Sequence, residues 1–272
     1  MGNFHPDRYQ KKVIESHATH IVVKAGAGSG KTSTMIEKIR LLVDCYGADQ
    51  KSIVVLTFTN VAASYMRTKY LNESNKSYSD DSIPYFGTFH AFCYRVLSEN
   101  QDAVKAIGYE HLPYIADDIE MQNMIMESLN AVGSSLTAKQ ISNKENLYGK
   151  KRLEYEHYIK YLKSKMIKNN IIDFDTLSES VCNLFKTCDA SVSKLKDECK
   201  YLFVDEFQDT DNIQFDFIKS MEKSRVFLFG DPMQNIYRFR GCTNTPMKNL
   251  VKDDKWVKFE LPIDYRSTVN IC

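Results

Sequence analysis

The sequence of 272 residues has no long apolar run. No stretch approaches the roughly 18 uninterrupted apolar residues that a membrane-spanning helix needs. The first residues, MGNFHPD, also lack the basic and then apolar pattern of a signal peptide. We therefore expect a cytoplasmic protein with no membrane partner.

Cysteine pairs at metal-binding or disulfide-framework spacing are missing as well. The seven cysteines are odd in number and scattered, and none stands in a CxxC pattern, so we expect reduced thiols and no zinc site. The formal net charge of +1 shows no excess of basic residues. A near-neutral total still permits a local basic groove, because nucleic-acid binding depends on where Lys and Arg lie.

The pattern that is present alternates short apolar strands with helical stretches. Residues 21–23 and 53–58 read as strands, and helical spacing follows each of them. Strand signals vanish between about residues 99 and 172, where apolar residues recur at helical spacing, and they resume at 201–204 and 226–229, with 257–261 as a further candidate. This order predicts an α/β domain with a central parallel sheet, built from residues 1–98 and 173–272, and a helical insertion at 99–172.

A glycine-rich loop, AGAGSGKT at residues 25–32, follows the first strand and opens a helix. Such a loop can direct backbone N–H groups at phosphates, while Lys31 reaches the β and γ phosphates and the Thr32 hydroxyl coordinates Mg²⁺. The alternative is a structural turn that binds nothing, but the Lys-Thr pair and the position between strand and helix favour ATP and Mg²⁺ as ligands. The candidate ATP contacts here are Ala25, Gly26, Ala27, Gly28, Ser29, Gly30, Lys31, Thr32 and Ser33.

Two carboxylates, Asp205 and Glu206, end the apolar strand at 201–204. We expect Asp205 to hold Mg²⁺, directly or through water, and Glu206 to orient and deprotonate the attacking water. Exposed acidic residues often follow strands, so the acidic pair indicates a nucleotide site only in combination with the predicted phosphate loop.

The longer motif VDEFQDT at residues 204–210 resembles that of the UvrD/Rep-like superfamily 1 DNA helicases. Further matches follow in the family's order and cover essentially the whole chain, most weakly between about 100 and 170. They are Gln10, LTFTN at 56–60, GTFH at 87–90, IDFD at 172–175, FGDPMQNIYRFRG at 229–241 and DYRS at 264–267. The resemblance implies a RecA-like P-loop NTPase domain that carries an all-helical insertion subdomain.

The resemblance also implies roles for individual residues. Gln10 would read the adenine edge and Tyr265 would stack on the base, while Gln234 would sense the γ phosphate and Arg266 would stabilise its developing charge. With Lys31 and Glu206, Gln234 and Arg266 complete the expected catalytic set.

Aromatic residues within the matching motifs are the expected contacts to single-stranded DNA or to single/double-strand junctions. Stacking on bases is tolerant of sequence and suits Phe58, Tyr237 and Phe239, although core packing is the ordinary role of such side chains. The resemblance adds four residues that would contact the DNA backbone or shape the groove: Thr59, Asn60, His90 and Arg240.

Three positions depart from the family pattern. Asp264 replaces the usual Asn, Val61 stands where Lys is common, and Tyr65 stands where an acidic residue is usual. None removes a catalytic group, but a carboxylate at position 264 would disfavour ATP unless it is paired or turned away.

The family places ATP between two RecA-like domains, and the resemblance finds only the first of them in these residues. We expect the second domain, with its arginine finger, in cis or in trans, and slow turnover without it. The leading hypothesis is an ATP-dependent helicase or translocase that moves 3′ to 5′. A natural half-motor that acts with a partner chain is the second hypothesis, and an unrelated P-loop enzyme such as a small-molecule kinase is the third.

Overall fold

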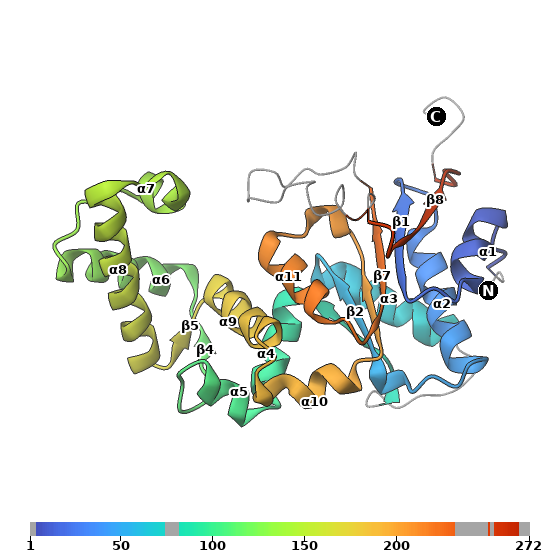
Figure 1. The fold of residues 1–272 in the computed structure, drawn as a ribbon, viewed down its shortest axis with the longest axis horizontal. Coiled ribbons are helices and arrows are strands. Elements are labelled where there is room, and N and C mark those ends of the chain that lie inside the picture. The colour runs from blue at the N-terminus through green and yellow to red at the C-terminus, as the bar shows by residue number, and fades with distance from the viewer. Residues whose placement is uncertain (1–3, 74–81, 232–249, 251–252, 267–272) are drawn as a thin grey trace. The chain divides into compact units, whose positions relative to one another are not determined.

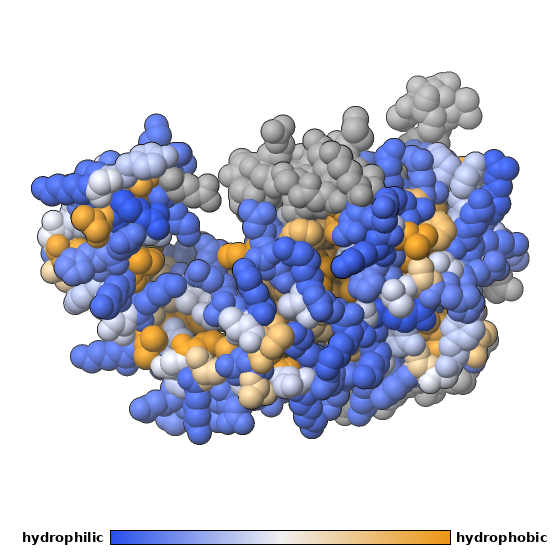
Figure 2. Space-filling model, viewed as in Figure 1, coloured by the Kyte–Doolittle hydropathy of each residue, from blue (hydrophilic) through white to orange (hydrophobic). Residues whose placement is uncertain are grey.

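The computed structural model describes residues 4–73, 82–231, 250 and 253–266. The chain forms two compact units, one made of Met1–Cys93 with Cys182–Cys272 and the other of Tyr94–Val181. No helix within the described residues is long and apolar enough to cross a membrane. On the face shown in Figure 2, hydrophilic residues predominate and the hydrophobic ones lie in small separate groups.

The first unit is built on a six-stranded sheet in which every neighbouring pair of strands is parallel, in the order β3-β2-β6-β7-β1-β8 (Figure 1). This confirms the predicted α/β class. The inner strands β2, β6 and β7 are short apolar runs, as expected for strands covered on both faces, whereas the edge strand β8 is largely exposed. Their bounds are β1 His20–Ala25, β2 Ile53–Thr57, β3 Tyr85–Thr88, β6 Tyr201–Val204, β7 Arg225–Gly230 and β8 Val257–Leu261.

Helices α1 (Arg8–Glu15), α2 (Lys31–Asp44) and α3 (Asn60–Glu73) pack on one face of this sheet. The buried α2 residues Met35, Ile36, Ile39 and Leu42 recur at helical spacing and share a core with alternate strand residues. The short 3-10 helix Gln50–Ser52 leads into β2. One face of the sheet is thereby sealed, and α1 and α2 are fixed beside the loop that joins β1 to α2.

The remaining helices of the first unit lie on the other side of the sheet (Figure 1). The rings of Phe89, Phe92 and Phe185 each contact the ring of Phe217, with centroids 4.9 to 5.7 Å apart. These four rings join α4, α9 and α11 into one layer. The helices are α4 Phe89–Ser98, α9 Phe174–Lys186, α10 Ala190–Glu198 and α11 Asn212–Ser220, with the 3-10 helix Phe207–Asp209 after β6.

The second unit is helical apart from two strands of two residues each, which pair in parallel. Its own core contains Met124, Leu136, Tyr158, Leu162 and Met166. The elements are α5 Gln101–Ala106, β4 Tyr114–Ile115, α6 Asp118–Ala131, α7 Ala138–Ser142, a 3-10 helix Lys144–Asn146, α8 Gly149–Lys168 and β5 Ile171–Ile172.

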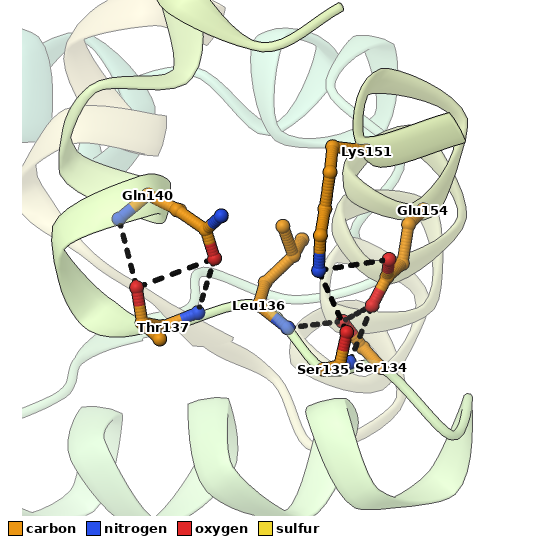
Figure 3. A network of polar contacts seen from close by, with 7 residues as sticks. All are labelled: Ser134, Ser135, Leu136, Thr137, Gln140, Lys151 and Glu154. Carbon is orange, nitrogen blue, oxygen red and sulfur yellow. Dashed lines mark hydrogen bonds and ion pairs between the residues drawn. The ribbon is translucent and has the colours of Figure 1, made fainter. Parts of the chain in front are cut away.

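A polar network ties the loop between α6 and α7 to α8 in this second unit (Figure 3). The Glu154 carboxylate accepts hydrogen bonds from the Ser135 backbone N–H and from the Ser134 hydroxyl, and these bonds lower its pKa to about 2. Lys151 Nζ donates to Ser135 Oγ at 2.7 Å. Thr137 and Gln140 then form the capping box that starts α7. The network fixes the path of the loop between α6 and α7.

The division into units runs through two helices. The last residues of α4 and the first residues of α9 belong to the second unit, because the units divide after Cys93 and before Cys182. The sequence places the limits of the insertion at 99 and 172, the stretch in which strand signals are missing and helical spacing prevails. A helix that continues from one unit into the other causes no change of pattern in the sequence, so the limits 99 and 172 stay a prediction.

Candidate nucleotide site

All six strands of the large sheet run in the same direction, so their carboxyl ends share one edge. The motif residues of the sequence follow those ends: the glycine loop follows β1, residues 205–209 follow β6, Asp231 follows β7, and residues 264–266 follow β8. Ligands of open parallel sheets bind at this edge. The fold thus gathers residues that are more than two hundred positions apart in sequence, such as the glycine loop at 25–32 and residues 264–266.

The loop between β1 and α2 can be formed only with glycine at two positions. Gly28 and Gly30 have φ angles of 74° and 79°, in the left-handed region. A Cβ atom at Gly30 would lie 2.6 Å from Gln10 Nε2, and one at Gly28 would lie 1.9 Å from Asp264 Oδ1. Ala25 ends β1, and Lys31, Thr32 and Ser33 form the first turn of α2. The predicted phosphate loop therefore has the strand–loop–helix setting that it requires.

Lys31 and Glu206 meet across the site. Lys31 Nζ donates to Glu206 Oε2 at 2.8 Å, which brings the lysine expected to bind phosphate and the expected general base into contact. Glu206 itself has φ 50° and ψ 41°, a left-handed conformation that is uncommon for a residue with a side chain. Strain of this kind collects at functional sites, where the surrounding structure holds the residue in place.

Asp205 lies behind this pair and is almost fully buried. Its Oδ1 atom has no hydrogen-bond partner among the described residues. Burial, together with the neighbouring charge of Glu206, raises the pKa of Asp205 to about 7. A buried carboxylate oxygen without a donor fits a cation, and carboxylate and hydroxyl oxygens suit Mg²⁺. The residues present thus fit the predicted pair of Mg²⁺ ligands, Asp205 and Thr32.

No three His, Cys, Asp or Glu side chains within the described residues are grouped so that they could hold a metal ion by themselves. This agrees with the usual habit of Mg²⁺ at phosphate sites, where one or two protein oxygens are joined by phosphate and water.

Gln208 is a site residue to which the sequence assigned no role. Its Nε2 donates to Glu206 Oε2 at 2.8 Å, and its Oε1 accepts from the Asp231 backbone N–H at 2.9 Å. A Cβ atom at Gly230 would lie 2.6 Å from Gln208 Oε1, so the end of β7 approaches closely. Gln208 therefore links Glu206, the expected general base, to the end of β7. It stands inside the VDEFQDT motif, but only the fold reveals what it touches.

Gln10 and Tyr265 both contact the backbone of the glycine loop. Gln10 is 2% exposed, and its Nε2 donates to the Ser29 carbonyl at 3.2 Å. Tyr265 is exposed, its backbone N–H donates to the Gly28 carbonyl at 2.9 Å, and its hydroxyl donates to the Asp7 carboxylate. The two residues expected to contact the base therefore flank the phosphate loop.

Asp264 is the departure from the family pattern that places a carboxylate beside the glycine loop, and its side chain is hydrogen-bonded within its own loop. Its Oδ1 accepts from the Arg266 backbone N–H at 2.8 Å. The hydrogen bond offsets part of the negative charge that faces the glycine loop. Arg266 is exposed at the same edge of the sheet.

Four of the expected DNA contacts follow β2 and β3, which are neighbours at one end of the sheet. Phe58 is half-buried after β2, Thr59 and Asn60 are exposed at the start of α3, and His90 is half-buried in the first turn of α4. The glycine loop follows β1, and β6 and β7 stand between it and β2. The other expected contacts, Tyr237, Phe239 and Arg240, lie outside the described residues, as does Gln234.

Sequence comparison decides the family. The profile of the UvrD/REP helicase N-terminal domain matches residues 7–255. The chain belongs to the UvrD/Rep helicase family. A probable DNA helicase II homologue of Mycoplasma capricolum is 32% identical over 91% of this chain and 37% of its own length. The ATP-dependent DNA helicase Rep of Buchnera aphidicola is 31% identical over 91% of this chain and 38% of its own length.

A third UvrD/Rep relative is the ATP-dependent DNA helicase PcrA of Staphylococcus epidermidis, which is 26% identical over 96% of this chain and 38% of its own length. The chain thus spans well under half the length of these relatives. The family assignment confirms the resemblance that the motifs indicated.

Proposed function

We propose that this chain binds Mg-ATP and single-stranded DNA and supplies the N-terminal part of an ATP-driven helicase or translocase that moves 3′ to 5′. The observation that carries the proposal is the 2.8 Å contact between Lys31 and Glu206, which unites the glycine loop and the acidic strand end in one site. The relatives named as ATP-dependent DNA helicases support the choice of reaction and of nucleic acid.

The chemistry follows from the residues at the edge of the sheet. Lys31 leaves Glu206 for the β and γ phosphates, because the phosphates carry more negative charge than one carboxylate. Glu206 is then free to orient a water molecule and to accept its proton as the water oxygen attacks the γ phosphorus. The bond from phosphorus to the bridging oxygen breaks, and ADP and phosphate are released.

Mg²⁺ held by Asp205 and Thr32 would neutralise charge on the phosphate oxygens. The other tasks, orienting Glu206 and binding the phosphates and the base, fall to residues of the chain. Gln208 keeps Glu206 oriented through its hydrogen bond, and the backbone N–H groups of the glycine loop face the phosphates. Gln10 and Tyr265 flank the loop where an adenine base would lie.

Rapid turnover requires a second RecA-like domain, in cis or in trans, that brings an arginine finger to the γ phosphate. Such a finger contributes on the order of 10³ to 10⁵ in rate. Strand separation also needs a second grip on DNA. These 272 residues by themselves therefore bind both ligands but turn over slowly.

The test is ATP turnover by the chain, with and without single-stranded DNA, with Glu206→Gln as the blank. Slow turnover that is absent in Glu206→Gln supports the assignment of the base. Brisk turnover stimulated by DNA would contradict the requirement for a second domain and would favour a half-motor completed by self-association. Phosphorylation of a metabolite without affinity for single strands would favour a small-molecule kinase.

A further inference from the structure

Helix α1 is fastened at its N-terminal end to the phosphate loop. Gln10 accepts from the Asp7 backbone N–H through Oε1 at 3.0 Å, and its Nε2 donates to the Ser29 carbonyl at 3.2 Å. Asp7 in turn caps the helix by accepting from the backbone N–H of Gln10. The position of Gln10 beside the nucleotide site therefore depends on where the whole of this eight-residue helix is held.

The C-terminal end of α1 is fastened by a buried lysine. Lys38, on α2, is 0% exposed, and its Nζ donates to the carbonyls of Ile14 and Ser16, both at 2.7 Å. Arg225, at the start of β7, adds a bond from Nη2 to the Ala18 carbonyl at 3.2 Å. The two basic side chains thus donate to three backbone carbonyls, at the end of α1 and in the segment between α1 and β1.

This arrangement is unusual for a buried lysine. No carboxylate within the described residues forms an ion pair with Lys38, and the charged group that acts on it, Arg225, is also a cation. Burial and this like charge lower the pKa of Lys38 to about 8. The free carbonyls at a helix C-terminus carry partial negative charge and take the place of a counter-ion. An apolar side chain of the same length would fill the space without this desolvation cost, so filling space does not explain the lysine.

We propose that Lys38 is a positioning residue for base selection: it fixes the C-terminal end of α1 on α2, the helix that begins at the phosphate loop, and so sets where Gln10 lies. The inference rests on the proposed function, in which Gln10 reads the adenine edge. Lys38 itself touches neither nucleotide nor phosphate. Its loss therefore acts on discrimination between bases more than on phosphate binding.

The test compares Lys38→Met, which keeps the length of the side chain but removes the donors, with Lys12→Met, an exposed lysine on α1. Dissociation constants for Mg-ATP and Mg-GTP are measured for wild type, both variants, Gln10→Ala and the Gln10→Ala/Lys38→Met double variant, at a temperature at which all are folded. Lys38→Met is expected to reduce the preference for ATP over GTP by about 3- to 10-fold, the effect of one or two hydrogen bonds. Lys12→Met is expected to leave the preference unchanged.

The double variant is expected to lose no more preference than the more affected single variant, because both changes act through the same amide. Equal weakening of ATP and GTP binding in Lys38→Met would overturn the inference and leave Lys38 a purely structural residue. If Lys38→Met does not fold, Lys38→Gln takes its place, because it retains two N–H donors on a shorter side chain. Its ratio of dissociation constants for Mg-ATP and Mg-GTP is then compared with that of wild type. A Gln10→Ala variant with unchanged preference refutes the adenine role in the proposed function, whereas a loss in Gln10→Ala but not in Lys38→Met refutes only the role of Lys38.

Discussion

At the scale of single residues, the candidate site contains two carboxylates whose surroundings cost folding free energy, Asp205 through burial and Glu206 through its backbone conformation. Asp205 is buried with an oxygen that lacks a donor among the described residues, and Glu206 has a left-handed backbone. Neither feature stabilises the fold. Both place a carboxylate where a cation and a reacting water are expected, at a cost on the order of 1 kcal/mol or more for each.

The left-handed backbone at Glu206 predicts an inversion of the usual order of stability. Glycine is normally less stabilising than alanine, but a left-handed conformation costs a residue with a Cβ atom about 1 to 2 kcal/mol. Glu206→Gly should therefore be more stable than Glu206→Ala by about 1 kcal/mol in urea unfolding. Both variants lose the contact with Lys31, so the comparison isolates the backbone. An alanine variant of equal or greater stability would contradict the strained conformation.

The residues for which the sequence predicts a role are those whose chemistry is local in sequence. The glycine loop, Asp205 and Glu206 stand in short motifs beside predicted strands, so their roles follow from residue type and position. Gln208 could not be assigned, because its partners are the side chain of Glu206 and the backbone of Asp231. That contact depends on the close approach of β6 and β7.

At the scale of elements, the alternation of strands and helices predicted the parallel sheet, and the structure adds that the motifs follow the carboxyl ends of its strands. Lys38 shows what the pattern leaves out. It lies three residues after Met35 and four before Leu42, on the buried face of α2, yet a lysine in a helix is ordinarily read as exposed. The carbonyls that it binds belong to another helix, and their place follows only from the packing of α1 on α2.

The buried position of Lys38 predicts a pH dependence of stability. The folded chain releases the Lys38 proton near pH 8, whereas the unfolded chain keeps it up to the ordinary pKa of 10.5. Between these values the unfolded state binds more protons, so the contribution of Lys38 to stability rises with pH and is lost as the pH falls through 8. The neutral amine still has two N–H donors for Ile14 and Ser16.

The measurement is urea unfolding of wild type, Lys38→Met and Lys12→Met at pH 7.5 and pH 10. The free energy of unfolding of wild type minus that of Lys38→Met is expected to increase by about 2 kcal/mol across this interval. Lys12→Met should follow wild type at both pH values. A constant difference between wild type and Lys38→Met would show that Lys38 has an ordinary pKa in the folded chain.

At the scale of the whole molecule, one edge of the sheet carries both proposed sites. The nucleotide residues follow β6, β1 and β8, and the described DNA candidates follow β2 and β3. Since β6 pairs directly with β2, the strand that ends in Asp205 and Glu206 is a neighbour of the strand that ends in front of Phe58. The acidic pair and the described DNA candidates thus follow adjacent strands of the sheet.

The central claim is that residues 25–32, Asp205 and Glu206 form a Mg-ATP site, and equilibrium binding of Mg-ATP tests it most directly. The comparison is between wild type, Lys31→Ala and Lys24→Ala, since Lys24 is an exposed lysine on β1 whose Nζ forms an ion pair with Glu260. We predict that Lys31→Ala abolishes measurable binding and that Lys24→Ala binds as wild type does. Equal affinity for Mg-ATP in wild type and Lys31→Ala would contradict the account.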